Sequence, residues 1–179
     1  MNAFVIASAT KQSPSVRDCF VAQGLLAMTD LKVVEEPPDQ GEAIDLLRQS
    51  DEFSIALYPP EYRKQVDLPA LLADNVRFFI ARRDGRALGC MALVRTGPGK
   101  GELKRCFVTQ EARGQGVGLA LLLASEAAAR EQKMRVIQLE TGIRNNAALR
   151  LYRGCGYHDR GPFGDYPDNG VSVFLEKTL

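Results

Sequence analysis

A glycine-rich turn between a strand-like and a helix-like segment constrains this chain more than any other feature. The turn runs from Arg113 to Gly118, reads RGQGVG, and precedes residues 119–133, which are dense in Ala and Leu. Glycines allow tight turns, and the first N–H groups of a helix lack partners and carry partial positive charge. The pattern therefore predicts an anion site suited to a diphosphate, with Arg113 adding a charge-assisted contact. A turn that only caps the helix is the alternative.

Two common phosphate-binding loops do not fit this turn. A P-loop requires Lys followed by Ser or Thr after its glycines, and neither pair occurs here. A dinucleotide-binding loop has the spacing G-x-G-x-x-G, whereas Gly114, Gly116 and Gly118 are spaced evenly by two. The acidic residue expected about 20 positions later is also missing from residues 133–136.

Composition excludes several classes of protein. The 179 residues suit one domain, and 23 basic against 22 acidic residues argue against a nucleic-acid binder or a polybasic membrane anchor. The single histidine, His158, rules out a multi-histidine metal site, so no metal is expected. Four widely spaced cysteines and the lack of a 20-residue apolar run predict a reducing, cytoplasmic setting without membrane insertion. We read His158 as a solvent-facing or hydrogen-bonded structural residue.

From Leu31 onward the chain alternates between strand and helix patterns. Residues 1–29 lack a clear period, so we expect a loosely held extension there and one α/β domain over residues 30–179. Strands are expected at 31–35, 76–82, 87–96, 102–109, 136–139, 157–163 and 171–176, with helices at 42–50, 68–73, 119–133 and 146–153. Asp84-Gly85 predicts a hairpin, and the change to strands separated by helices predicts a change from antiparallel to parallel pairing.

Two motifs resemble the GNAT superfamily of acetyl-CoA-dependent N-acetyltransferases. Residues 113–118 are similar to the family's Q/R-x-x-G-x-G/A loop, and residues 145–157, NNAALRLYRGCGY, are similar to its N-x-x-A-x-x-L-Y-x-x-x-G-F segment, with Tyr157 in place of Phe. The resemblance covers the chain from about Leu31 to the C-terminus. It implies a mixed central sheet with an antiparallel N-terminal meander, two splayed central parallel strands and helices on both faces.

The resemblance also implies where acetyl-CoA binds as co-substrate. The pantetheine arm would enter between strands 102–109 and 135–141 and pair with the first of them as an added strand does. The diphosphate would lie on the amides of the glycine-rich turn. The residues expected to contact the cofactor are Cys106, Phe107, Val108, Arg113, Gly114, Gln115, Gly116, Val117, Gly118, Leu119 and Asn145.

The implied reaction is transfer of the acetyl group to the amine of a small molecule or protein. By this resemblance Tyr152 would protonate the departing thiolate, and the backbone N–H of Phe107 or Val108 would stabilise the oxyanion. Glu102 and Glu140 are candidate bases for the amine. The alternatives are a core aromatic for Tyr152, a solvated strand end for Glu102 and a structural helix cap for Glu140.

Outside these motifs the chain resembles a bacterial subgroup of GNAT acetyltransferases. Segments LYPPE, ELKR, LETG and GPFGDY carry this likeness. They suggest that Tyr58, Glu61 and Tyr166 line the acceptor pocket, unless they only pack around proline-rich turns. Family members also form homodimers, and the C-terminal strand could supply the edge for one. Two functions other than catalysis stay open: a non-catalytic acyl-CoA sensor and a structural or partner-binding protein.

Overall fold

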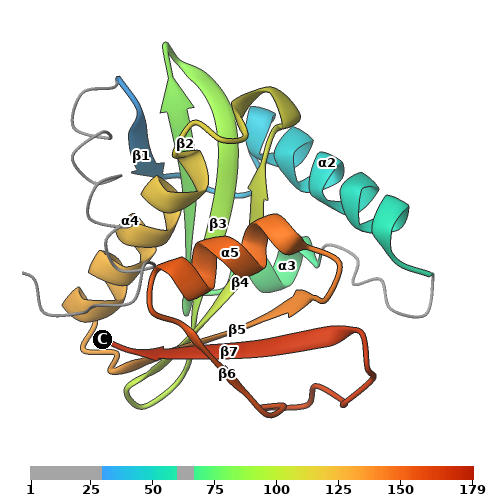
Figure 1. Ribbon diagram of the computed structural model, residues 1–179. Coiled ribbons are helices and arrows are strands. Elements are labelled where there is room, and N and C mark those ends of the chain that lie inside the picture. Colours follow the sequence, from blue (N-terminus) through green and yellow to red (C-terminus); the bar gives the residue numbers. More distant parts are fainter. Residues whose placement is uncertain (1–29, 60–66) are drawn as a thin grey trace, which may run out of the picture.

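The computed structural model describes residues 30–59 and 67–179, and within them seven strands form one mixed sheet. Their order across the sheet is β1-β2-β3-β4-β5-β7-β6 (Figure 1). The strands are β1 Lys32–Glu35, β2 Val76–Arg83, β3 Arg86–Gly97, β4 Lys100–Val108, β5 Val136–Gly142, β6 His158–Arg160 and β7 Ser172–Thr178. The extension expected at residues 1–29 lies outside the described residues.

The sheet changes from antiparallel to parallel pairing at its centre, as the sequence predicts. Strands β1 to β4 pair antiparallel in chain order, and β2 turns into β3 through Asp84 and Gly85, which have φ of 50° and 79°. Strand β4 then pairs parallel with β5, because α4 connects them across the face of the sheet. The predicted meander and the predicted parallel central pair are both confirmed.

The C-terminal strand lies inside the sheet. Strand β7 pairs antiparallel with β5 along Val136–Gly142 and with β6 on its other side. Strand β6 pairs with Phe174–Glu176, so β7 is not the edge strand of the sheet, and the suggestion that the C-terminal strand supplies the edge for a homodimer is wrong. The edge on that side belongs to the three-residue strand β6.

Helices cover both faces of the sheet, as expected (Figure 1). The helices are α2 Gly41–Leu57, α3 Leu68–Leu71, α4 Val117–Glu131 and α5 Asn146–Gly154, with a 3-10 turn at Gln110–Ala112. The side chains of strand β2 alternate between two buried clusters, one on each face of the sheet. Phe78 and Ile80 pack with α2 and α3, whereas Phe79 and Ala81 join the cluster under α4 and α5. This alternation follows from the two-residue period of a strand.

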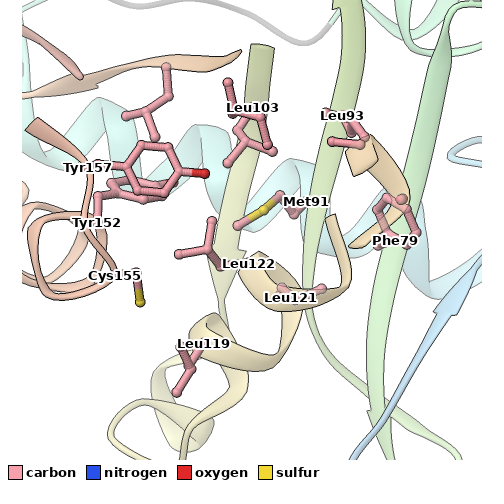
Figure 2. Close-up of a cluster of buried hydrophobic side chains, with 14 of the residues drawn as sticks. Phe79, Met91, Leu93, Leu103, Leu119, Leu121, Leu122, Tyr152, Cys155 and Tyr157 are labelled. Atoms are coloured by element: carbon pink, nitrogen blue, oxygen red, sulfur yellow. The ribbon is translucent and has the colours of Figure 1, made fainter. Parts of the chain in front are cut away.

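The larger buried cluster fixes α4 and α5 against the sheet. Figure 2 shows Leu121 and Leu122 of α4 beside Met91 of β3, with Tyr152 and Tyr157 approaching from α5 and the turn that follows it. Tyr152 and Tyr157 meet edge to face with ring centroids 5.6 Å apart. Between β4 and α4 the chain passes through the 3-10 turn and then the glycine-rich turn, and Gly118 at the end of that turn lies against Leu151 of α5.

Several elements differ from their expected bounds, and α2, β6 and α4 show why. Helix α2 continues past Ser50 to Leu57, because Phe53 packs onto the sheet even though charged residues obscure the periodicity there. Strand β6 covers 158–160 instead of 157–163, since Gly161-Pro162 follows and proline cannot donate to a ladder. Helix α4 begins at Val117, two residues early, because Gly118 belongs to its first turn.

Candidate active site

The two central parallel strands separate after four paired residues. Strand β4 pairs with β5 from Lys100–Val136 to Leu103–Leu139, yet β4 continues to Val108 and β5 to Gly142. A β-bulge lies in the separated part of β4: Ala92 faces Lys104 and Cys90 faces Phe107, so two residues of β4 oppose one of β3. The strands therefore open a gap that backbone pairing does not fill.

The glycine-rich turn holds backbone amides at the start of α4. Gly114 and Gly116 have φ of 75° and 80°, which side-chain-bearing residues rarely adopt. The Ala120 amide bonds to the Gly116 carbonyl, whereas the first three amides of α4, from Val117 to Leu119, have no backbone acceptor in the described part of the chain. These amides are available to an anion at the positive end of the helix dipole.

A cavity of about 730 Å³ connects this turn to the gap between the strands. All eleven residues expected at the cofactor line it, from Cys106, Phe107 and Val108 through the turn at 113–119 to Asn145. Sequence reasoning missed six further lining residues, Phe53, Arg83, Ala112, Ala147, Ala148 and Leu151. Of these only Ala147, Ala148 and Leu151 belong to a segment that the motifs already marked.

Two arginines flank the turn. The Arg113 guanidinium lies 4.5 Å from the ring centroid of Phe53 in α2, and its Nε donates to the Val108 carbonyl at 3.3 Å. Arg83, at the end of β2, donates from Nη1 to Gln115 Oε1 at 2.6 Å. Arg83 is distant from the glycine-rich turn in the sequence. It lies beside the turn because the hairpin between β2 and β3 is at the same end of the sheet as the C-terminal end of β4.

A second cavity, of about 410 Å³, is lined by both separated strands, residues 103–106 of β4 and 140–142 of β5. Four residues line both cavities, namely Phe53, Cys106, Asn145 and Ala148. Tyr58, Tyr152, Tyr166 and Glu140 line the second cavity, together with Lys104 and Arg105. The two cavities therefore meet at Cys106. Glu61, expected in the same pocket, lies outside the described residues.

Tyr152 stands at this junction and remains protonated. It is 3% exposed, and its hydroxyl hydrogen-bonds with the Cys106 thiol. Burial raises the pKa of Tyr152 well above its ordinary value, with the neighbouring Cys106 as a further cause. Burial likewise raises the pKa of Cys106. Both groups are therefore neutral near pH 7, and the Tyr152 hydroxyl keeps its proton, which it donates to Cys106.

The two candidate carboxylates occupy different positions. Glu140 lines the second cavity and accepts a hydrogen bond of 2.6 Å from Ser172 Oγ. Glu102 is only 5% exposed and does not belong to the cavity wall. Tyr166 donates to Glu102 Oε1 at 2.5 Å and lies between that carboxylate and the cavity. The solvated strand end considered for Glu102 is therefore wrong, since the carboxylate is buried.

The end of α2 is tied to the loop between β5 and α5. Tyr58 Oη accepts from the Arg144 amide at 3.1 Å, and Arg144 Nη1 donates to the Leu57 carbonyl at 3.0 Å. Gly142 permits this contact, since a Cβ there would lie 2.0 Å from Tyr58 Oη. Asn145 caps α5, accepting from the Ala148 amide at 3.3 Å, so the helix cap is Asn145 and not Glu140.

His158 lies away from both cavities. Its side chain is 63% exposed, and Nε2 is 3.6 Å from Glu176 Oε1, in agreement with the solvent-facing role expected for it. Among residues 30–59 and 67–179, no three His, Cys, Asp or Glu side chains cluster as a metal site would require. None of the helices in the described ranges has the length and hydropathy to span a bilayer.

Comparisons with known proteins agree with this architecture. The model of the acetyltransferase (GNAT) family matches residues 42–157. The chain is 39% identical over 153 residues to the IAA acetyltransferase of Azospirillum brasilense, covering 85% of this chain and all (100%) of that protein. A solved Klebsiella pneumoniae chain assigned to the acyl-CoA N-acyltransferases is 34% identical, with a TM-score of 0.71 over 83% of this chain and 97% of that one.

A more distant structure shares the fold alone. The Bacillus subtilis acetyltransferase solved in complex with CoA is 21% identical, with a TM-score of 0.62 over 83% of this chain and 99% of that chain. The family match and the identity to the Azospirillum protein both span most of the residues that form the sheet and the two cavities. This chain belongs to the GNAT family of acetyltransferases and is an acyltransferase.

Proposed function

We propose that the protein moves an acetyl group from acetyl-CoA to the amine of a small molecule or protein. One observation carries this proposal: the cavity under the amides of α4 and the cavity lined by Glu140 meet at Cys106, beside Tyr152. A thioester that lies in the first cavity would present its carbonyl to an amine in the second. The GNAT structure from Elizabethkingia anophelis has acetyl-CoA bound, and the Bacillus subtilis structure has CoA.

Binding of acetyl-CoA would use the backbone more than side chains. The amides of Val117, Gly118 and Leu119 would hold the diphosphate, with Arg113 beside them. The separated part of β4, from Cys106 to Val108, would pair with the pantetheine amides, because β5 no longer occupies that edge. Asn145 would contact the cofactor at the junction of the cavities.

Transfer would be direct. The acceptor nitrogen bonds to the carbonyl carbon, the backbone N–H of Phe107 or Val108 stabilises the oxyanion, and the carbon–sulfur bond then breaks. Tyr152 gives its proton to the departing thiolate. Glu140 takes a proton from the acceptor ammonium, for which its place on the cavity wall is suited. Tyr58 and Tyr166 would shape the acceptor pocket.

The three described cysteines, Cys90, Cys106 and Cys155, are free thiols. We include a reducing, cytoplasmic setting in the proposal on that ground. Metal is not part of the proposed mechanism, since Tyr152 and Glu140 supply the proton transfers.

The direct test mixes protein, acetyl-CoA and a panel of amines, and follows release of free CoA thiol and the mass of the acetylated product. Release that depends on both protein and amine would support the proposal. Calorimetric binding of acetyl-CoA without turnover over a broad panel would point to a sensor. A thermal-shift assay without any response to CoA would point to a structural protein, because a ligand of the native state raises stability.

A further inference from the structure

We infer that Arg83 binds the phosphate on the ribose of acetyl-CoA, and that the protein therefore prefers CoA to dephospho-CoA. The inference rests on the proposed binding of acetyl-CoA and assigns to it a residue that determines specificity. It starts from the charges of the cavity at the glycine-rich turn. Among the described residues that line this cavity, Arg83 and Arg113 carry the only charged side chains, and none is acidic.

Strand β2 ends in two consecutive arginines that lie in different surroundings. Arg82 contacts Glu36 at 2.6 Å and also Glu42 of α2, so carboxylates of the fold neutralise its charge. Because successive side chains of a strand alternate, Arg83 lies on the opposite face, where the glycine-rich turn leads into α4. The strand therefore places one arginine in an ion pair and the next in the cavity.

A neutral residue holds the Arg83 side chain in place. Arg83 Nη1 donates to Gln115 Oε1 at 2.6 Å, and Gln115 Nε2 donates in turn to the Glu111 carbonyl at 2.7 Å. The remaining N–H groups of the Arg83 guanidinium have no acceptor among residues 30–59 and 67–179. The Glu111 carboxylate does not line the cavity and accepts from its own backbone N–H and from Thr109. Arg83 is therefore fixed in position while its charge stays available to a ligand.

The two arginines are held separately, so they can serve two different phosphates. Arg113 lies beside the separated part of β4, where Nε donates to the Val108 carbonyl and the guanidinium lies over the Phe53 ring. A diphosphate on the amides of α4, with Arg113 beside it, would leave Arg83 as a second cation.

CoA supplies a second anion for that cation. Its ribose phosphate follows the diphosphate on the side away from the thioester, and a phosphate monoester carries about two negative charges at pH 7. With the thioester at Cys106, this phosphate would lie at the exposed end of the cavity, where Gln115 is exposed and Arg83 half-buried. A guanidinium matches a phosphate through paired N–H···O bonds.

The test compares CoA with dephospho-CoA, which lacks only the ribose phosphate. Calorimetry at about 0.15 M salt, where screening limits the effect of distant charges, gives the dissociation constant of each ligand. The measured quantity is the ratio of the dissociation constant of dephospho-CoA to that of CoA. We expect a ratio of about ten to a hundred for the wild-type protein, the range for hydrogen bonds to a charged group.

The same ratio is measured in three variants. Arg83→Gln should reduce it towards one by weakening CoA alone, and an unchanged affinity for dephospho-CoA shows that the cavity is intact. Arg83→Lys should keep part of the preference, because an ammonium retains the charge without the paired donors. Arg86→Gln is the matched control: Arg86 faces Arg83 across the hairpin and loses the same charge, but it is exposed and does not line the cavity. Its ratio should equal that of the wild-type protein.

Steady-state kinetics provide a second readout. In Arg83→Gln the KM for acetyl-CoA should rise while kcat stays unchanged, because the ribose phosphate is remote from the bond that breaks and contributes equally before and during the reaction.

The outcomes separate this inference from the proposed function. Equal affinities of the wild-type protein for CoA and dephospho-CoA would overturn the inference and leave acetyl transfer intact. Equal weakening of both ligands in Arg83→Gln would overturn it by assigning Arg83 to the diphosphate, and an equal loss of preference in Arg86→Gln would reduce the effect to net charge. A preference for CoA that depends on Arg83, without turnover of any amine, would support the inference while refuting the proposed reaction. Binding of neither ligand would overturn both.

Discussion

Tyr166 donates a hydrogen bond to Glu102 Oε1 at 2.5 Å, and so a residue 64 positions away covers the buried carboxylate of β4. The ring of Tyr166 is fixed by edge-to-face contacts with Phe163 and Phe174, at centroid distances of 5.1 Å and 5.9 Å. Burial raises the pKa of Tyr166, with the bond to Glu102 as a second cause, so its hydroxyl stays protonated. The relationship distinguishes two glutamates that look equivalent in the sequence, because of the two only Glu140 lines the second cavity, the one proposed for the acceptor.

Glu140→Gln should therefore impair acetyl transfer more than Glu102→Gln. We expect kcat/KM of Glu140→Gln to fall by about a hundredfold near pH 7, the scale of general-base catalysis. The deficit should shrink as pH rises, because the acceptor amine then loses its proton to solvent. Glu102→Gln should keep the wild-type pH profile of kcat/KM. The reverse ranking of the two variants would assign the base to Glu102, acting through Tyr166.

Tyr152→Phe should lower kcat and leave the acetyl-CoA affinity unchanged. The ring still fills its place beside Tyr157, but the hydroxyl that would protonate the thiolate is lost. A general acid contributes about a hundredfold or more to the rate. Steady-state release of CoA gives kcat, and calorimetry gives the dissociation constant. An unchanged kcat would remove Tyr152 from the mechanism.

Gly116→Ala should weaken acetyl-CoA binding. The φ of 80° at Gly116 costs an alanine roughly 1–2 kcal/mol, and relief of this strain would turn the amides of α4 away from the diphosphate. We expect about a tenfold higher dissociation constant by calorimetry. Gly154→Ala is the matched control, because a Cβ there meets no atom within 4 Å and its φ is not positive. Equal affinities in both variants would count against the amide site.

Acetyl-CoA should protect Cys106 from alkylation. Cys106 lines both cavities and is partly exposed, whereas Cys90 and Cys155 are 0% and 8% exposed. Because burial raises the pKa of Cys106, labelling with maleimide should be slow and should speed up with pH. Peptide mass spectrometry at increasing acetyl-CoA concentrations then follows each cysteine separately. If saturating acetyl-CoA left the labelling rate of Cys106 unchanged, the ligand would bind elsewhere.

Stability should fall as the pH rises above about 10, the pKa of tyrosine in an unfolded chain. Burial raises the pKa of Tyr152 and of Tyr157 in the folded protein. Above pH 10 the unfolded chain therefore releases these protons while the folded chain keeps them, and the free energy of unfolding decreases. Urea unfolding between about pH 8 and pH 11 measures this slope. Tyr152→Phe should flatten it, and an identical slope in the variant would show that Tyr152 ionises normally.

The sequence by itself determined which residues surround the cavity at the glycine-rich turn and the order of the elements. Glycines at 114 and 116, the amides at the start of α4, which lack a backbone acceptor among the described residues, and the cap at Asn145 are local features, because backbone conformation and neighbouring residues suffice to specify them. All eleven residues expected at the cofactor line that cavity. The family resemblance supplied the splay of β4 and β5, which pair only as far as Leu103 and Leu139.

Only the tertiary structure decided the lining of the second cavity, the one proposed for the acceptor. The place of β7 between β5 and β6, the second half of α2 and the contact of Tyr166 with Glu102 join residues far apart in the chain. The bulge at Arg105 is likewise defined by its register against β3 and held by Asp51 of α2. Such contacts depend on how whole elements pack, and no local periodicity encodes them. The sequence could therefore predict the residues around the cavity at the glycine-rich turn, while the lining of the second cavity became visible only in the folded chain.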